Sequence, residues 1–330
     1  MLNIDSHDTW QNFSNSMTED DSRNRPLIRR REVIGLFSAA ALVLCSPARG
    51  ARQTGTAAET ALADLERRSG GRLGVAIVDI QTGDMVGHQV DERFGMCSTF
   101  KLPLAAFILL DAQNGHLELD AAVRFGADDM VPYAPVVEQN VARGYMSILE
   151  LAEAAQTKSD NVAANLLLDL VEGPAGFTSR LRTVGDNVTR LDRYEPELNF
   201  VPPGETRDTT TPAAFAGAIR RLLGGSLLSV KSIGTLRSWM ENTSTGLARL
   251  RAGFPAGWSV GDKSGTGIAV GMPNKYNDVA VIWSGQGIPD FVVAAFYEAD
   301  GEYDHTRGQD IEVLKKTGEI AAKEISLNDR

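Results

Sequence analysis

The chain has 330 residues, of which 43% are hydrophobic and 23% are charged, and its formal net charge is −10 at pH 7. This is the composition of an ordinary globular protein, and the length allows one large domain or two smaller ones with a substantial buried core. The negative charge without a basic stripe argues against a nucleic-acid binder, and the four scattered histidines, without any Cys-x-x-Cys, give no metal-ligand spacing.

Residues 1–48 predict an export signal. A basic stretch precedes the apolar run at 33–45, and small residues surround Ala48. The run has the length of a signal hydrophobic region and is too short to span a bilayer. The segment RREVI at 30–34 resembles the twin-arginine export pattern, although it would also serve as the basic region of the ordinary secretion route. Cleavage predicts a mature protein, residues 49–330, that is periplasmic or secreted and has no stable membrane anchor.

The first part of the mature chain predicts a helix and a pair of strands. Residues 57–68 carry apolar side chains at helical spacing, and the segment SGGRLG ends them. Residues 72–90 predict two strands around a Thr-Gly-Asp turn. Residues 98–115 are apolar nearly all round and predict a buried helix. Pro103 is compatible with a helix only near its start, which places Ser98 at the helix N-terminus.

The middle of the chain predicts helices, and its end predicts strands. Residues 190–212 are rich in proline and charge and predict a long ordered loop. Helical segments are expected at 147–160, 161–171, 173–185, 209–223 and 308–325, and strands at 257–267, 277–285 and 290–299.

Because strands occur near both ends of the chain, we expect an α/β (α+β) fold whose antiparallel sheet is built from both ends and flanked by helices. The α/β lobe would comprise about 49–95 and 240–330, and an all-helical lobe about 96–239. Residues 49–330 would then form a single domain with its active site in the cleft between the lobes.

Ser98 and Lys101 form the first chemically suggestive motif. Three residues apart on a helix, they lie on one face. A serine hydroxyl needs a neighbouring base, and a lysine in apolar surroundings near other cations has a lowered pKa and can accept its proton. The N–H of Ser98 is a natural half of an oxyanion hole, and the backbone N–H of Thr266 after Lys263-Ser264-Gly265 suits the other half.

Glu195 and Asn199 form a second motif within the 190–212 loop. Their spacing lets a carboxylate and an amide hold the same water, as a general base requires. The loop also holds Arg193 and Asp208, which either close it as an ion pair or are solvated surface charges.

Each motif has an ordinary structural explanation when taken alone. Ser98 to Lys101 would be a helix start, Ser159-Asp160-Asn161 a helix cap, and Lys263-Ser264-Gly265 a strand end followed by a turn. In combination and in this order, with the stretches RYEPELN and RDTTTP, they resemble the serine β-lactamases of class A. The resemblance extends from about residue 57 to the last predicted helix.

The resemblance implies the roles of the reacting residues. Ser98 is the acylated nucleophile, and Lys101 and Glu195 are both candidate bases for acylation. Glu195 with Asn199 activates the water that hydrolyses the acyl-enzyme. The N–H groups of Ser98 and Thr266 form the oxyanion hole.

The resemblance also assigns the residues that bind substrate. Ser159 passes a proton to the lactam nitrogen, and Asn161 holds the substrate side-chain amide. Lys263, Ser264 and Thr266 bind the substrate carboxylate, with Ser264 in place of the commoner threonine.

The family supplies an arginine toward that carboxylate, and the stretch TGLARLRAGFP points to Arg249, with Arg251 as a structural residue. Tyr133 would flank the site mouth; the alternative is a packed loop aromatic.

Cys97 resembles the cysteine that forms a disulfide in carbapenem-hydrolysing members, but the partner position here is Gly267, so that disulfide is not expected.

The implied function is hydrolysis of penicillins and cephalosporins, and hence antibiotic resistance, by a monomeric enzyme without cofactor or metal. A penicillin-binding DD-peptidase, or a β-lactam sensor, would be acylated without turnover. The presence of Glu195 and Asn199 argues against the first, and a cleaved signal argues against a membrane-tethered sensor. The histidine pattern rejects a metal-dependent hydrolase.

Overall fold

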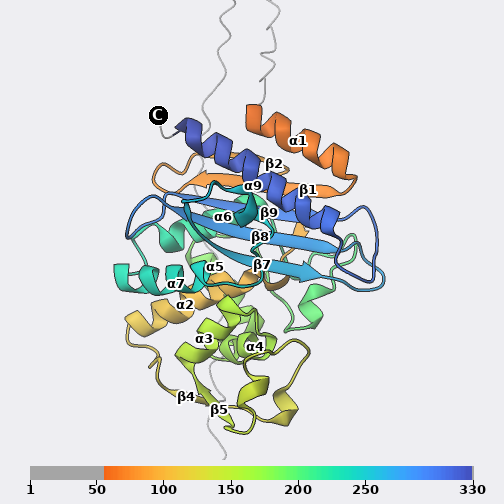
Figure 1. Ribbon diagram of the computed structural model, residues 1–330. Coiled ribbons are helices and arrows are strands. Elements are labelled where there is room, and N and C mark those ends of the chain that lie inside the picture. The colour runs from red at the N-terminus through yellow and green to blue at the C-terminus, as the bar shows by residue number, and fades with distance from the viewer. Residues whose placement is uncertain (1–55, 329–330) are drawn as a thin grey trace, which may run out of the picture. The chain divides into compact units, whose positions relative to one another are not determined.

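Five antiparallel strands form the main sheet, and both ends of the chain supply them (Figure 1). The computed structural model describes residues 56–328. The strand order is β2-β1-β9-β8-β7, with β1 at Arg72–Asp79, β2 at Met85–His88, β7 at Ser259–Gly267, β8 at Lys275–Trp283 and β9 at Phe291–Glu298. The predicted antiparallel sheet assembled from both ends is confirmed. The predicted export signal at 1–48 lies outside the described residues.

Two helices cover one face of the sheet, namely α1 (Ala57–Ser69) and α9 (Gly308–Asn328) (Figure 1). A capping box fixes the start of α1, since the hydroxyl of Thr56 accepts from the Glu59 N–H and the Glu59 carboxylate accepts from the Thr56 N–H. Gly70, with φ 78°, ends the helix in the left-handed conformation that glycine tolerates. Between these helices and the sheet lies one of two apolar cores.

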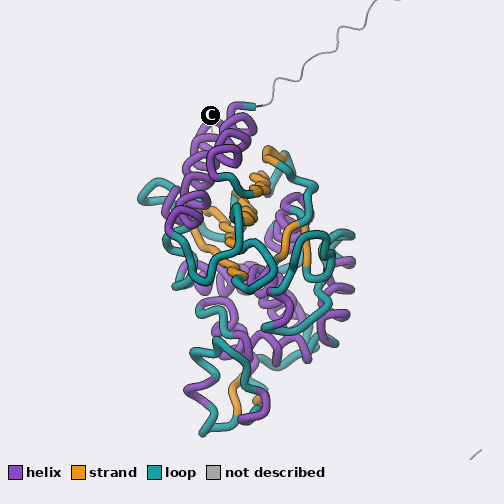
Figure 2. The backbone as a smooth tube through the Cα atoms, turned by 90° about the vertical axis from the view of Figure 1, so that its right-hand side faces the viewer, coloured by secondary structure: helices purple, strands orange, loops and turns teal. Residues whose placement is uncertain are grey.

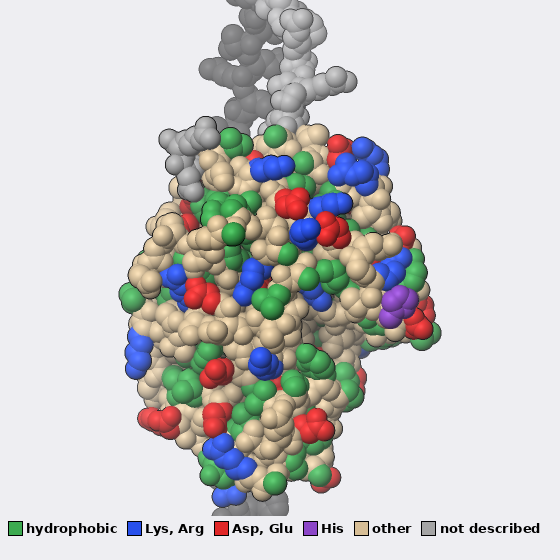
Figure 3. Space-filling view, viewed as in Figure 1, with side chains coloured by type: hydrophobic (Ala, Val, Ile, Leu, Met, Phe, Trp, Pro, Cys, Tyr) green, Lys and Arg blue, Asp and Glu red, His purple; other side chains and the backbone are tan. Residues whose placement is uncertain are grey.

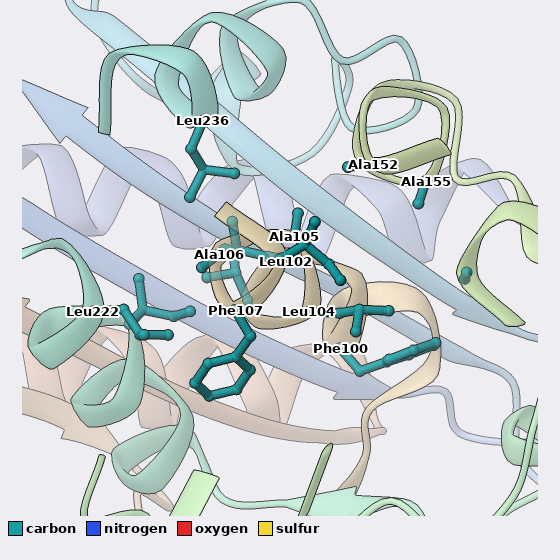
Figure 4. Packing of buried hydrophobic residues seen from close by; sticks show 14 of the residues in the cluster. Phe100, Leu102, Leu104, Ala105, Ala106, Phe107, Ala152, Ala155, Leu222 and Leu236 are labelled. Atoms are coloured by element: carbon teal, nitrogen blue, oxygen red, sulfur yellow. The ribbon is translucent and has the colours of Figure 1, made fainter. Parts of the chain in front are cut away.

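The second core surrounds α2 (Lys101–Gln113), whose residues are buried on every side (Figure 4). On this face of the sheet α6 (Pro212–Leu223) packs against β1 and β9, and α7 (Val230–Glu241) packs against β7. Seen from the side in Figure 2, the strands lie between helical layers. Because α2 is enclosed by helices and sheet, its first turn is held rigidly.

A group of helices packs beyond α2, comprising α3 (Ile148–Thr157), α4 (Asn161–Asp169) and α5 (Gly173–Thr183). Two small antiparallel ladders accompany them: β4 (Ala122–Arg124) pairs with β5 (Tyr145–Ser147), and β3 (Phe94–Gly95) pairs with β6 (Thr209–Thr210). Short 3-10 turns lie at Ala127–Asp129 (η2) and Glu138–Asn140 (η3). None of the described helices is both long and apolar enough to cross a membrane.

The structure differs from the sequence prediction in several places, among them the short strands β3 to β6, which were not predicted. Helix α7 and the short α8 (Leu250–Gly253) were not predicted. The predicted helix does not begin at Ser98: a 3-10 turn, η1 (Cys97–Phe100), comes first, and α2 begins at Lys101. Helix α6 packs on the sheet, although it falls within the range expected for the helical lobe.

Over the face shown in Figure 3, acidic and basic side chains are interspersed.

Candidate active site

Ser98 is presented by the η1 turn directly before α2. Cys97 adopts φ 47°, a conformation uncommon outside glycine, and the residues flanking Ser98 are buried while Ser98 itself is partly exposed. The Ser98 hydroxyl donates to Oε1 of Glu195 at 3.0 Å. The turn therefore offers one hydroxyl whose proton already points at a carboxylate.

Lys101 is fully buried and meets Ser98 through that same carboxylate. Its Nζ lies 2.9 Å from Glu195 Oε1 and donates to the carbonyl oxygen of Ser159 at 2.8 Å and to Asn161 Oδ1 at 2.6 Å. These three acceptors use the three donors of an ammonium group. Burial lowers the pKa of Lys101, and the nearby Glu195 charge opposes this. The sequence suggested a direct proton transfer from Ser98 to Lys101. In the structure the Glu195 carboxylate lies between the two groups.

Two asparagines hold Glu195 in place, and only one of them was predicted. Asn199, in the 3-10 turn Glu197–Asn199 (η4), donates to Glu195 Oε2 at 2.5 Å. Asn165 on α4 pairs with the Glu195 backbone, donating to its carbonyl and accepting from its N–H, both at 2.9 Å. Asn199 Oδ1 is buried without a hydrogen-bond partner among the described residues, so it can accept from a water beside Glu195.

An ion pair closes the loop that carries Glu195. Arg193 Nε donates to Asp208 Oδ2 at 2.6 Å, and Asp208 Oδ1 accepts from the N–H groups of Asp192 and Arg193. Asp208 is fully buried, and Arg193 also donates to the carbonyl of Phe200. Of the two sequence interpretations, the ion pair is confirmed.

Replacing Arg193 by alanine is expected to lower the free energy of unfolding by about 3 kcal/mol, because it leaves a buried carboxylate without its cation. Urea unfolding measures the loss, and turnover falls with it because Glu195 shares the loop. Arg143→Ala is the matched control, since Arg143 pairs with Glu150 on the surface and its removal should leave the unfolding midpoint unchanged. Equal midpoints for the two variants would contradict the role given to Arg193.

Ser159, Asn161 and Lys263 meet on the opposite side of Ser98. Asp160 caps α4 by accepting from the Ala163 N–H, which confirms the helix-cap interpretation, and this leaves its neighbours free to face the cavity. Ser159 adopts φ 58°, and its hydroxyl accepts from Lys263 Nζ at 2.9 Å. Burial, together with the charge of Lys101, holds the pKa of Lys263 well below its usual value. The Ser159 hydroxyl therefore keeps its own proton available for donation, and the Lys263 ammonium group donates a hydrogen bond to its oxygen.

Arg249 reaches the cavity, whereas Arg251 does not. Arg249 is buried, donates to the carbonyls of Gly265 and Asn277 at 2.7 Å each, and donates to the Thr266 hydroxyl at 2.5 Å. Arg251 instead forms an ion pair with buried Asp262. The separation predicted for the two arginines, one at the site and one structural, agrees with these contacts.

A cavity of about 450 Å³ joins these groups. Its walls include eight of the predicted site residues, whereas Lys101, Glu195 and Lys263 lie buried behind it. The lining residues are Ser98, Tyr133, Ser159, Asn161, Asn199, Ser244, Thr245, Arg249, Ser264, Gly265 and Thr266. Sequence reasoning missed Ser244 and Thr245, of which Thr245 is hydrogen-bonded to the Ser264 hydroxyl at 2.7 Å.

The edge of β7 approaches Ser98 closely. A Cβ on Gly265 would lie 3.2 Å from the Ser98 nitrogen and 2.9 Å from the Met96 carbonyl, so a side chain there would press on the nucleophile turn. Exposed Tyr133 stands at the mouth of the cavity.

Cys97 lies beneath the nucleophile turn as a free, buried thiol, and burial raises its pKa to about 12. A Cβ at Gly267 would lie 3.0 Å from its Sγ, so Gly267 occupies the position that a disulfide partner would take.

Comparison with known proteins yields one consistent group. Residues 57–325 match the family described as "Beta-lactamase enzyme family". Beta-lactamase FAR-1 of Nocardia farcinica is 47% identical over 238 residues, covering 72% of this chain and 74% of that relative. A beta-lactamase of Mycobacterium tuberculosis is 42% identical over 293 residues, covering 86% and 93%. A solved class A beta-lactamase, the last common ancestor of Gram-negative bacteria, gives a TM-score of 0.75 at 47% identity, covering 82% of this chain and all of that one.

Proposed function

This chain belongs to the beta-lactamase enzyme family, and from that premise we propose which residue acts at each step of its reaction. The protein is a class A serine β-lactamase: it hydrolyses the β-lactam ring. The family establishes this activity, and the roles of the individual residues are our proposal.

Glu195 takes the proton of Ser98 in the acylation step. The observation that supports this is the position of Glu195 Oε1, which lies 3.0 Å from Ser98 Oγ and 2.9 Å from Lys101 Nζ. As Oγ attacks the lactam carbonyl, its proton moves along the existing hydrogen bond to Oε1. Lys101 acts through the carboxylate, because its Nζ contacts Glu195 Oε1 and holds it in position until the transfer.

Ser159 completes acylation by protonating the leaving nitrogen. When the lactam C–N bond breaks, the Ser159 hydroxyl gives its proton to the nitrogen and is resupplied from Lys263, whose Nζ is 2.9 Å away. The lowered pKa of Lys263 favours that transfer. The N–H groups of Ser98 and Thr266 stabilise the carbonyl oxygen as it becomes negative.

Four side chains hold the substrate, and Arg249 assists them. Ser264 and Thr266 line the cavity and bind its carboxylate, with the buried Lys263 behind them, and Asn161 binds its side-chain amide. Arg249 donates to the Thr266 hydroxyl, which leaves that hydroxyl's own proton free for the carboxylate. Tyr133 borders the entrance.

Hydrolysis of the acyl-enzyme uses Glu195 a second time. Asn199 Oδ1 and the Glu195 carboxylate offer two acceptors to one water, so the carboxylate can remove a proton as the water attacks the ester. Before this second step begins, Glu195 loses the proton it took from Ser98, and that proton restores the one that Lys263 gave to Ser159.

A time course with excess chromogenic cephalosporin tests the complete cycle on the mature protein, residues 49–330. Turnover far beyond one equivalent supports the two uses of Glu195. A burst of one equivalent followed by a plateau would instead match a penicillin-binding peptidase or a sensor, which are acylated and not released.

The same proposal extends to the cell. The signal at 1–48, with its RREVI segment, supports export by the twin-arginine route to the periplasm or the medium, where a monomer without a membrane anchor would meet antibiotics and confer resistance. The intact mass of the exported protein reports the cleavage position, and a mass matching the full chain would contradict it.

A further inference from the structure

Two carboxyl groups that take no part in the proposed reaction lie fully buried beneath Arg249. Asp262 on β7 and Asp278 on β8 share the face of the sheet that is covered by residues 243–253. In the strand register Ser264 pairs with Asp278, so Asp262 lies diagonally across from it. The two acids are therefore neighbours inside the protein, on consecutive strands of one hairpin.

The contacts of the two acids leave at least one oxygen of each without a hydrogen-bond donor among the described residues. Asp262 forms its ion pair with Arg251, and Asp278 Oδ2 accepts from the Leu250 N–H at 3.1 Å. Asp262 Oδ2 and Asp278 Oδ1 are buried and have no hydrogen-bond donor among the described residues. Both border the α-carbon of Gly246, where a Cβ would lie 1.9 Å from the first and 3.3 Å from the second. The free oxygens thus face one small space.

Two ionised carboxylates in that space would repel each other and lack solvation. The charged groups around them are Lys263 from β7 and Arg249 and Arg251 from the 243–253 segment. Burial raises the pKa of Asp262, and burial together with the charge of Asp262 raises that of Asp278 well above its usual value. A proton on one acid would supply the missing donor to the other.

We propose that Asp262 and Asp278 share a single proton, so that the pair carries one negative charge, and that Asp278 is a positioning residue for Arg249. Asp278 holds the Leu250 N–H, the peptide next to Arg249, and fixes where the arginine enters the cavity. With only one negative charge beneath it, Arg249 keeps its attraction for a substrate carboxylate. A second charge would weaken that attraction.

The proton itself can be observed without any substrate. In protein labelled with ¹³C-aspartate, the wild type at pH 7 should show the infrared carbonyl band of a protonated carboxylic acid, and this band should vanish at alkaline pH. Asp278→Asn should lack the band at pH 7. Absence of the band in the wild type overturns the shared proton, and this measurement needs no folded variant.

Thermal unfolding gives a second test that is independent of β-lactam turnover. A carboxyl whose pKa is raised by folding contributes stability below its unfolded pKa and loses it as pH rises toward the folded value. The amide introduced in Asp278→Asn can donate where the shared proton did. The difference in Tm between this variant and the wild type should therefore increase in favour of the variant from pH 5 to pH 8. A constant Tm difference across that range contradicts the proposal. Asp278→Ala should be less stable at every pH, because the Leu250 N–H loses its acceptor.

The positioning role of Asp278 rests on the function proposed for Arg249. It is tested by the pH dependence of KM. With a carboxylate-bearing cephalosporin, the wild-type KM should rise several-fold as the pair loses its proton at alkaline pH. The KM of Asp278→Asn should rise less, because only the titration of Lys263, common to both proteins, remains. Parallel KM profiles would overturn the positioning role. If the infrared band is present and no hydrolysis occurs, the proposed function fails and the shared proton stands.

Discussion

Replacing Ser98 by alanine is expected to abolish hydrolysis, with a loss in kcat of about a million-fold, the magnitude seen when a serine nucleophile is removed. Without Oγ no ester forms, and the remaining groups can only orient substrate and stabilise charge. The variant should still bind a cephalosporin, because Lys263, Ser264 and Arg249 are unchanged. Steady-state absorbance measures turnover, and intact-protein mass spectrometry should find no adduct.

The structure offers a matched control for this experiment. Ser179 lies exposed on α5, and its hydroxyl donates only to the Ala175 carbonyl, so Ser179→Ala should keep full activity. The hydroxyl of Ser98 makes one hydrogen bond, to Glu195, and Ala is tolerated in a helical turn, so the Ser98 variant should fold. Full activity in Ser98→Ala would refute the nucleophile assignment.

Replacing Glu195 by alanine is expected to trap the acyl-enzyme. Deacylation depends on the carboxylate that holds the water with Asn199, so its rate should fall by about 10³ to 10⁴, within the range for loss of a general base. Acylation should slow as well, because Ser98 donates to the same carboxylate, and Lys101, which contacts that carboxylate, is then the remaining candidate base. Mass spectrometry after mixing with substrate should show one covalent equivalent.

Glu197→Ala controls for damage to the loop. Glu197 is exposed and lies two residues from Glu195 in the same loop, so this variant should turn over normally. If Glu195→Ala gives no adduct and also no turnover, Lys101 cannot replace it as the acylation base. If it turns over at the wild-type rate, Glu195 is not the deacylation base.

Sequence patterns predicted the elements whose signal is local. The alternation and apolar runs of the strands, and the turn and cap residues around α1 and α3, specify structure within a few residues. Helix α7 was missed although Ile233, Leu236 and Met240 recur at helical spacing, so a local signal for it was present in the sequence.

The site was predictable where chemistry follows sequence spacing, as for Ser98 with Lys101 and for Glu195 with Asn199. Asn165 was not, because an asparagine within a helix gives no sign that it pairs with a loop peptide thirty residues away. The Asp262–Asp278 pair was hidden for a similar reason: only the strand register makes them neighbours. Long-range contacts of this kind require the fold itself.

The burial of α2 also bears on how this enzyme can evolve. Lys101 and nearly all of the residues after it up to Leu109 have no surface to vary, so any change that moves the nucleophile also unpacks the central core and costs stability. Leu247, Ile268 and Val270, by contrast, are exposed. Mutations that adapt the enzyme to new antibiotics should therefore accumulate at the exposed positions of the 244–248 segment and of the 268–271 turn, where side chains can change without loss of folding stability.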